Sequence, residues 1–227
     1  MEISFAFNHL LLTGLLLTTL FSAFVRAENS AARDSDLKSV VEKTQILLGE
    51  IVEKSFPELR ETKIKVKTFK SQKNYFKARF AFSRFLTFRK MQTIIFVNPL
   101  VFERNAPAEG IRAILAHELA HALYYNERNR LKLFGLIGLI DGGFEAQFER
   151  NADLVAVYRG YGEGLIIYRN WLYQNVPADD LKVKKRNYFT PDELKVLTPA
   201  VSGNLSIFEK LKKNVPRNLS EVEKALN

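Results

Sequence analysis

The sequence predicts an α+β fold in which a small, partly antiparallel sheet packs on a helix and the C-terminal half is mostly helical. Two observations carry this prediction. Apolar residues recur at helical spacing over residues 36–55, whereas apolar and charged residues alternate at strand spacing within residues 63–85. The chain has 227 residues, of which 47% are apolar or aromatic, and this is enough for one domain with a proper core.

Three short stretches are expected to form the sheet. In residues 63–67, lysines alternate with β-branched residues, which predicts a strand with one basic face. Residues 75–85 repeat this alternation, with aromatic side chains on one side, and residues 93–97 form a fully apolar run. Because the connections between these stretches are brief, we expect the sheet to be at least partly antiparallel.

Helices are expected in the remainder of the chain. Residues 105–109 have the composition of a helix start, with a proline in the first turn and a glutamate near the positive end of the dipole. A second helix is expected over about residues 144–158, and the apolar run before it, residues 131–140, is expected to pack in the core or to cross a cleft. Capping-box sequences at residues 190–193 and 220–223 predict two further short helices.

Residues 1–27 have the features of a signal peptide. An apolar run over residues 10–25 ends in the tripeptide Val-Arg-Ala, which suits a cleavage site, and polar sequence follows at once. An uncleaved anchor is the alternative, although sixteen apolar-to-neutral residues are few for a membrane-spanning helix. We therefore expect an exported domain over residues 28–227, periplasmic or secreted, which stays membrane-associated if the segment is kept.

The charged residues and the lack of cysteine limit the possible functions. The absence of cysteine excludes disulfides, thiolate metal ligands and a cysteine nucleophile. The net charge is +9, and residues 60–90 contain eleven Lys or Arg against one acid. This basic sheet face suits contact with an anionic surface such as a membrane, with a merely solvated face as the alternative. Nucleic acid is not an expected partner, because no recognition motif accompanies the charge.

The helix expected after residue 105 contains two of the three histidines, His117 and His121, with Glu118 beside the first. Positions i and i+4 lie on one face of a helix, so both imidazoles can bind one ion, and neutral imidazole suits Zn²⁺. Glu118 is rotated about 100° around the helix, where it can act as a general base towards water that the metal activates. A hydrogen-bonded pair of core histidines is the non-functional alternative.

The third ligand is expected to be a carboxylate. Catalytic zinc takes about three protein ligands, and His9 is lost if the signal peptide is removed. The second expected helix supplies Glu149 and, four residues later on the same face, Asp153. We expect Glu149 to complete the coordination and Asp153 to accept a hydrogen bond from the outer nitrogen of a ligating histidine, which fixes its tautomer. Glu145 is a competitor for the ligand role, and a solvated pair of acids is the non-functional alternative.

With these motifs, the chain resembles the Glu-zincin metallopeptidases, and within them the HtpX-like and CAAX-prenyl-protease-like group. That group combines His-Glu-x-x-His with Glu-x-x-Ala-Asp on the next helix, which here starts at Glu149, and with a following Gly-Tyr turn, here Gly160 and Tyr161. The resemblance covers about residues 91–175. It implies a zincin-type fold and a zinc-dependent endopeptidase that hydrolyses peptide bonds in peptides or proteins.

The resemblance also implies a role for each matching residue. It assigns zinc ligation to two histidines and one glutamate, a general base, and an aspartate that supports a ligand: His117, His121, Glu149, Glu118 and Asp153, respectively. In addition, it implies an edge strand near residues 93–97, to which an extended peptide could add as a further strand.

Two departures from the group leave questions open. Most members are multi-pass membrane proteases, whereas no helix after residue 27 is expected to be long enough to span a membrane. Several zinc peptidases stabilise the oxyanion with a downstream histidine, which this chain lacks. The tyrosines and the arginine nearest in sequence are the candidates for that part: Tyr124, Tyr125, Tyr158, Arg159 and Tyr161. The rival functions are a non-catalytic exported binding module that uses the basic face of residues 60–90, and a metal-dependent hydrolase of non-peptide amides or esters.

Overall fold

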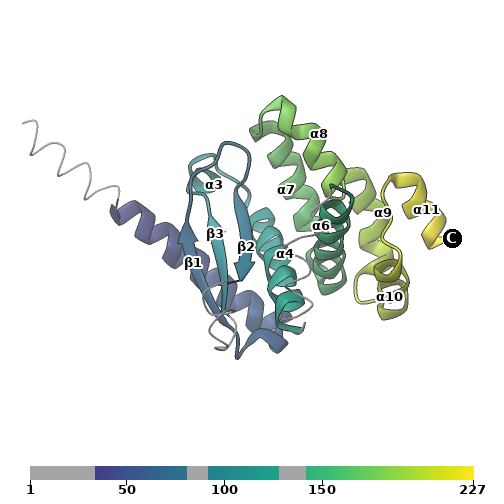
Figure 1. Cartoon of the computed structure of the whole chain (residues 1–227), viewed down its shortest axis with the longest axis horizontal. Helices are drawn as coiled ribbons and strands as arrows, with labels where there is room; N and C mark the ends of the chain where they lie inside the picture. Colours follow the sequence, from purple (N-terminus) through teal and green to yellow (C-terminus); the bar gives the residue numbers. More distant parts are fainter. Residues whose placement is uncertain (1–33, 81–91, 128–141) are drawn as a thin grey trace, which may run out of the picture. The chain divides into compact units, whose positions relative to one another are not determined.

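A computed structural model describes residues 34–80, 92–127 and 142–227 (Figure 1). Contacts divide the chain into two units, residues 1–40 and residues 41–227, and the second unit contains the sheet and the predicted site residues. In the described part of the chain, no helix is both long and apolar enough to cross a membrane. The expected signal peptide and the apolar run over residues 131–140 lie outside the described residues, so both stay predictions.

The predicted N-terminal helix is present over residues 34–55. Within the second unit, its buried side chains Thr44, Leu48 and Ile51 recur at intervals of three and four residues, as expected of a helix with one apolar face. A short 3-10 turn, η1 (Pro57–Leu59), connects this helix to the sheet.

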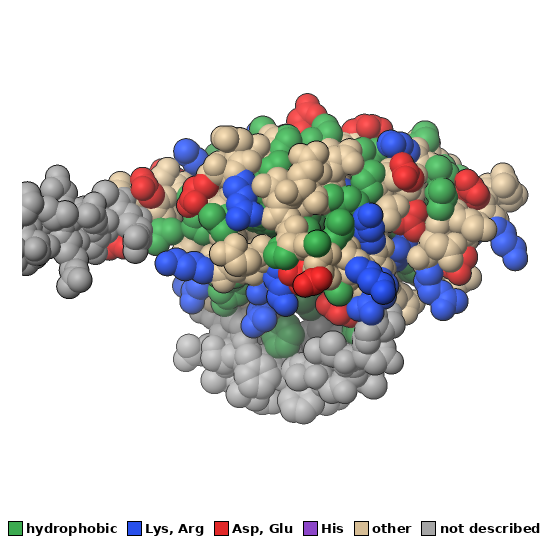
Figure 2. Space-filling view, turned by 90° about the horizontal axis from the view of Figure 1, so that it is seen from above, with side chains coloured by type: hydrophobic (Ala, Val, Ile, Leu, Met, Phe, Trp, Pro, Cys, Tyr) green, Lys and Arg blue, Asp and Glu red, His purple; other side chains and the backbone are tan. Residues whose placement is uncertain are grey.

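The sheet has three strands, and it is mixed, as predicted. The strands are β1 (Lys63–Thr68), β2 (Phe76–Phe80) and β3 (Gln92–Val97). Their order is β1-β3-β2, in which β1 runs parallel and β2 antiparallel to β3. The lysines of β1 are exposed, which confirms its basic face. Figure 2 shows Lys and Arg side chains prevailing over acids in the lower part of the face that it presents.

The expected edge strand near residues 93–97 is wrong, because β3 lies in the centre of the sheet. Ile95 pairs with Val66 of β1 on one side and with Ala78 of β2 on the other. A fully apolar strand is typical of the sheet interior, where both faces are covered. In the described residues, β2 and β1 are therefore the edges, and β2 is the edge that packs against the helix with the histidines, α4 (Ala108–Glu127).

Helices form the rest of the second unit, which confirms the mostly helical C-terminal half. After the short α3 (Leu100–Glu103) and α4, the described helical elements are α6 (Gly142–Ala156), the π-helical η2 (Val157–Tyr161), α7 (Gly162–Asn175), α8 (Ala178–Asn187), α9 (Pro191–Val201), α10 (Leu205–Lys213) and α11 (Leu219–Leu226). In Figure 1, α4 lies between the sheet and α6, and α4 also packs closely against α7. Most of α4 from Gly110 to Leu123 is buried.

Two glycines determine how α7 approaches α4. Gly160 has a φ of 88°, a left-handed conformation that side-chain-bearing residues rarely adopt, and it turns the chain from α6 into α7. A Cβ atom at Gly164 would lie only 2.7 Å from the Cβ of Ala113, so the two helices come close at this position. This approach places the middle of α7 next to the centre of α4.

Only one of the two predicted capping boxes is present. Thr190 caps α9, and its side chain and that of Glu193 exchange the expected hydrogen bonds. The box predicted at residues 220–223 is wrong: α11 starts earlier, and the side chain of Asn218 accepts the hydrogen bond from the backbone N–H of Glu221. Asn is at least as good an N-cap as Ser, so the helix gains two residues by starting after Asn218.

Candidate metal centre

The structure brings together His117, His121 and Glu149, which we call the His-His-Glu cluster. The two histidines lie on one face of α4, as their spacing predicts, and both are buried. Their Nε2 atoms are 3.1 Å apart, and Oε2 of Glu149 in α6 lies 3.1 Å from each of them. Among the described residues, this is the group that could hold a metal ion, and Glu145 is not part of it.

The chemistry of the cluster fits a metal ion. Nδ1 of His117 donates a hydrogen bond to Asp153, 2.8 Å away, so Nε2 of the neutral imidazole carries a lone pair. That lone pair faces Glu149 Oε2 and Nε2 of His121, each 3.1 Å away, so a metal ion or a proton among these atoms would stabilise the group. Donors about 2.1 Å from a tetrahedral zinc ion are about 3.4 Å from one another, which is close to this spacing.

The charged groups around the cluster also favour a positive charge within it. Burial disfavours the charged imidazole of His117, but Asp153 and Glu149 outweigh burial and raise its pKa to about 10. Burial also disfavours the charged carboxylate of Glu149, yet His121 and His117 hold the pKa of Glu149 far below its ordinary value. The cluster is therefore most stable when it contains positive charge.

Asp153 is fixed by hydrogen bonds from three residues in different parts of the fold. Besides His117, it accepts hydrogen bonds from Arg169 of α7, at 2.9 and 3.2 Å, and from the backbone N–H of Phe189, at 3.0 Å. Asp153 is completely buried, which raises the pKa of its carboxyl, but Arg169 and His117 outweigh burial and lower it. The aspartate is thus ionised and holds His117 in one orientation and one tautomer.

Glu118 occupies a different position from the cluster. Its side chain is buried beside β2, where burial raises its pKa, and a hydrogen bond from the backbone of Ala78 acts against that rise. Its Oε2 atom has no hydrogen-bond partner in the described protein. A buried carboxylate with one free oxygen and a raised pKa is suited to accepting a proton.

Tyr188, which the sequence did not single out, faces the same site. Its ring centre lies 5.8 Å from that of His117, and the cations of Arg169 and Lys184 lie 4.5 and 5.2 Å from its ring centre. In the described part of the chain, its hydroxyl makes no hydrogen bond to protein. Tyr188 lines a narrow cavity of about 20 Å³ together with His117 and Glu118. No local pattern marks this tyrosine, because it lies in the short connection between α8 and α9.

Three of the five predicted oxyanion candidates are engaged elsewhere. The hydroxyl of Tyr161 lies 2.9 Å from Oγ of Ser55, the guanidinium of Arg159 pairs with Glu58 at 2.9 Å, and Tyr158 stacks on Phe208.

The other two candidates lie near the cluster. Tyr124 packs edge-on against Phe148, with ring centres 5.1 Å apart. Burial raises the pKa of Tyr125, and the charges of Glu149 and Glu118 raise it further, so Tyr125 lies near both carboxylates.

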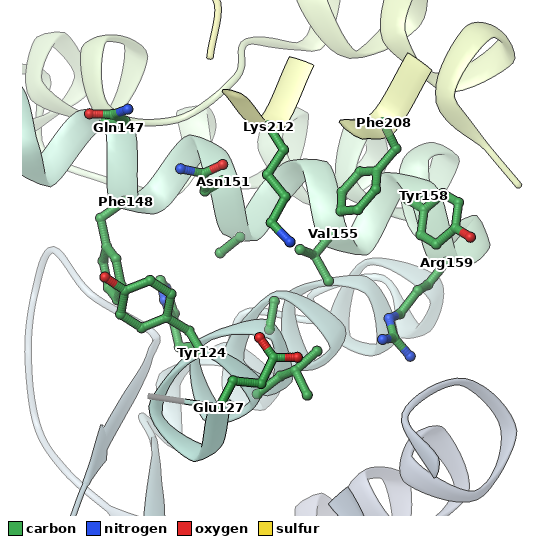
Figure 3. Close-up of a pocket in the computed structure, with 14 residues that line it drawn as sticks. Tyr124, Glu127, Gln147, Phe148, Asn151, Val155, Tyr158, Arg159, Phe208 and Lys212 are labelled. Atoms are coloured by element: carbon green, nitrogen blue, oxygen red, sulfur yellow. The ribbon is translucent and has the colours of Figure 1, made fainter. Parts of the chain in front are cut away.

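A larger cavity of about 420 Å³ lies next to His121 (Figure 3). Figure 3 shows Tyr124 and Phe148 at one end and Tyr158 with Phe208 at the other, with Lys212 reaching in between. The ring of Phe148 stacks on His121 at 4.4 Å. Of the described residues in the cluster, only His121 lines this cavity, and Glu118 and Tyr188 do not. It therefore adjoins the cluster without containing its reactive groups.

No protein-family model matches the chain, and no curated protein or solved structure shows significant similarity to it. Support for a function comes from the geometry of these residues.

Proposed function

We propose that the chain is a zinc-dependent metalloendopeptidase of the Glu-zincin type, whose metal motifs resemble those of the HtpX-like and CAAX-prenyl-protease-like group. One observation carries this proposal. Three potential metal-ligand atoms converge at 3.1 Å, while a separate buried carboxylate, Glu118, has an oxygen without a hydrogen-bond partner. A mixed sheet packed on the helix that contains His117 and His121 supports the zincin-like fold that we propose with it.

Each residue has a defined task in this proposal. His117, His121 and Glu149 hold the zinc ion, which supplies Lewis acidity and a water of lowered pKa when bound. Glu118 takes the proton of the attacking water through its free oxygen and passes it to the leaving amine. These roles use the two carboxylates differently, and their surroundings separate them: Glu149 has a lowered pKa and Glu118 a raised one.

Two further residues act around this centre. Asp153, paired with Arg169, keeps His117 in the tautomer that leaves Nε2 free. Tyr188 donates a hydrogen bond from its otherwise unpartnered hydroxyl to the carbonyl oxygen as negative charge develops there. Arg169 and Lys184 next to its ring hold the ring in position.

The edge strand β2 gives the substrate a way to bind. It pairs with β3 on one side, and Ala78 of β2 is the residue whose backbone contacts Glu118. An extended peptide that adds to an edge strand gains main-chain hydrogen bonds and places its own carbonyl groups in one line. We propose β2, instead of the central β3, as the strand to which the peptide adds.

The proposal is tested by the Glu118→Gln variant. We expect it to keep one zinc ion per chain, measured by elemental analysis, and to lose about 10²–10⁴-fold in the rate of peptide hydrolysis, because it removes proton transfer and not coordination. Glu145→Gln on the exposed side of α6 is the matched control and should change neither quantity. Peptides that the wild-type protein cleaves in a proteome-derived peptide library serve as the substrates of this assay.

Two results would favour the rival functions. Zinc binding without any Glu118-dependent hydrolysis would favour a binding module that uses the exposed lysines of β1. Glu118-dependent hydrolysis of simple esters or amides, without cleavage of any peptide, would favour a non-peptide hydrolase.

A further inference from the structure

We propose that Lys184 binds a carboxylate of the substrate, so that the site prefers substrates with an acidic group near the cleaved bond. This inference rests on the proposed hydrolase function and adds a substrate class to it. The feature that carries it is a part-buried ammonium group without a salt bridge in the wall of the narrow cavity.

Lys184 comes from α8 and lines the narrow cavity together with His117, Glu118 and Tyr188. Its ammonium donates one hydrogen bond, to Oδ1 of Asn74 at 2.8 Å, and lies 5.2 Å from the ring centre of Tyr188. An ammonium group has three donors, so two stay available for a ligand. In the described residues, no carboxylate lies within 4.0 Å of it.

The other cations of the same cavity already have acidic partners. Arg169 is buried and pairs with Asp153 at 2.9 Å, and the more exposed Lys73 has Asp180 at 3.8 Å. Lys184 is the part-buried cation that forms no salt bridge, and burial together with Arg169 lowers its pKa although the charges of Glu149, Asp180 and Glu118 act against this. Removing an ammonium from water without a counter-charge is unfavourable, and an anionic ligand relieves this penalty.

The size of the cavity limits the group that Lys184 can receive. About 20 Å³ is little more than the roughly 10–15 Å³ that one water molecule needs, so a small planar carboxylate suits it and an aromatic side chain does not. A peptide offers a carboxylate in two ways, as an Asp or Glu side chain or as its free C-terminus. Both present the same chemistry to the ammonium.

The test compares acidic and neutral peptides of equal shape on the zinc-loaded protein. A cleaved peptide is made with Asp or Asn at each position flanking the cleaved bond. A second series ends one to three residues after that bond, with a C-terminal carboxylate or carboxamide. We expect one acid–amide pair to differ about 10–100-fold in kcat/KM, the range of a hydrogen bond to a charged group. The first series identifies a side chain and the second a C-terminus.

Substitutions then attribute this preference to one residue. Lys184→Met should bring the acid-to-amide ratio close to one, and Lys184→Arg, which keeps the charge, should retain most of it. Lys182→Met is the matched control, because Lys182 is an exposed lysine of the same helix and its replacement removes an equal charge. This substitution should leave the acid-to-amide ratio unchanged. Zinc content and circular dichroism of each variant establish that it is folded.

Two results would overturn the inference: a wild-type ratio below about two in both series, or an undiminished ratio in folded Lys184→Met. If the wild-type protein cleaves no peptide, the proposed function fails and the inference is tested by binding. Calorimetry with the same peptide pairs should then show an acid preference that Lys184→Met removes, and equal binding of acid and amide would refute it.

Discussion

Two neighbouring residues of α6, Glu149 and Arg150, bury opposite charges in different surroundings. Arg150 points towards the C-terminal helices, where it donates to Glu193 at 3.0 Å and to the backbone oxygens of Pro216 and Arg186 at 3.2 and 3.3 Å. The other oxygen of Glu193 accepts the hydrogen bonds of its capping box. Every charge on this side therefore has a partner within the protein.

On the side of Glu149, the buried polar groups converge on one point, and one of them lacks a hydrogen-bond partner. The His-His-Glu cluster brings two ring nitrogens and one carboxylate oxygen within 3.1 Å of one another, and Oε2 of Glu118 has no partner among the described residues. Buried polar groups are normally satisfied, because leaving one unpaired costs about 1–3 kcal/mol. The difference between the two sides of α6 thus separates charges that hold the fold together from charges arranged for a ligand.

Replacement of Glu149 should have the largest effect on the proposed metal site. We expect Glu149→Gln to lose zinc binding and all peptide hydrolysis, because a neutral amide is a much weaker metal ligand than a carboxylate. Zinc titration with a competing chelator and a peptide assay measure the two effects, with Glu145→Gln as the control on the same helix. Full zinc affinity together with full activity in Glu149→Gln would place the ligand elsewhere and remove the main support for the Glu-zincin proposal.

Tyr188→Phe should give the next largest effect. It removes one hydroxyl and keeps the ring next to His117, so we expect unchanged zinc affinity, a largely unchanged KM and a loss of about 10²–10³-fold in kcat. Tyr125→Phe is the matched comparison, because Tyr125 is a predicted candidate whose pKa is raised by the charges of Glu149 and Glu118. A large loss in Tyr125→Phe with none in Tyr188→Phe would reverse the assignment.

The residues found from sequence and those missed differ in how they are positioned. His117, Glu118 and His121 lie within one turn or so of one helix, and Glu149 and Asp153 are one turn apart on another, so helical periodicity alone groups each set. Arg169, Lys184 and Tyr188 reach the site from α7, α8 and the connection after it. Their arrival depends on how the helices pack, and local sequence does not show this.

The fold, like the site, was predictable within each element but not in how the elements pack. The three strands and the main helices follow from spacing that one element contains within itself, and their type was predicted correctly. The order of the strands depends on the parallel pairing of β1 with β3, which are separated in sequence by β2, and the prediction of β3 as an edge strand was therefore wrong. The cap of α11 was misplaced for a smaller reason: two suitable capping residues, Asn218 and Ser220, lie close together.

Asp153→Asn should have an intermediate effect on the site and a separate effect on stability. Zinc affinity should fall by about 10–100-fold, because Asn orients His117 less well than a carboxylate does. Arg169 is then left buried without a counter-charge, which should lower the free energy of unfolding by about 3–5 kcal/mol. Adding Arg169→Met should restore part of the stability but not the zinc affinity. Recovery of both together would mean that Asp153 serves only to neutralise Arg169.

Arg150→Met should have the smallest effect on the site, although it removes a buried charge one residue from Glu149. Glu193 would be left buried without its partner, so we expect the free energy of unfolding, measured by urea denaturation, to fall by about 3–5 kcal/mol. Zinc affinity and kcat of the folded protein should stay within about twofold, because the partners of Arg150 lie in α8, α9 and the segment before α11. Glu193→Gln combined with Arg150→Met should recover part of the lost stability, since both charges are then absent. If Arg150→Met instead weakens zinc binding as strongly as Asp153→Asn does, the two sides of α6 are coupled, and complete satisfaction of a charge does not mark it as purely structural in this protein.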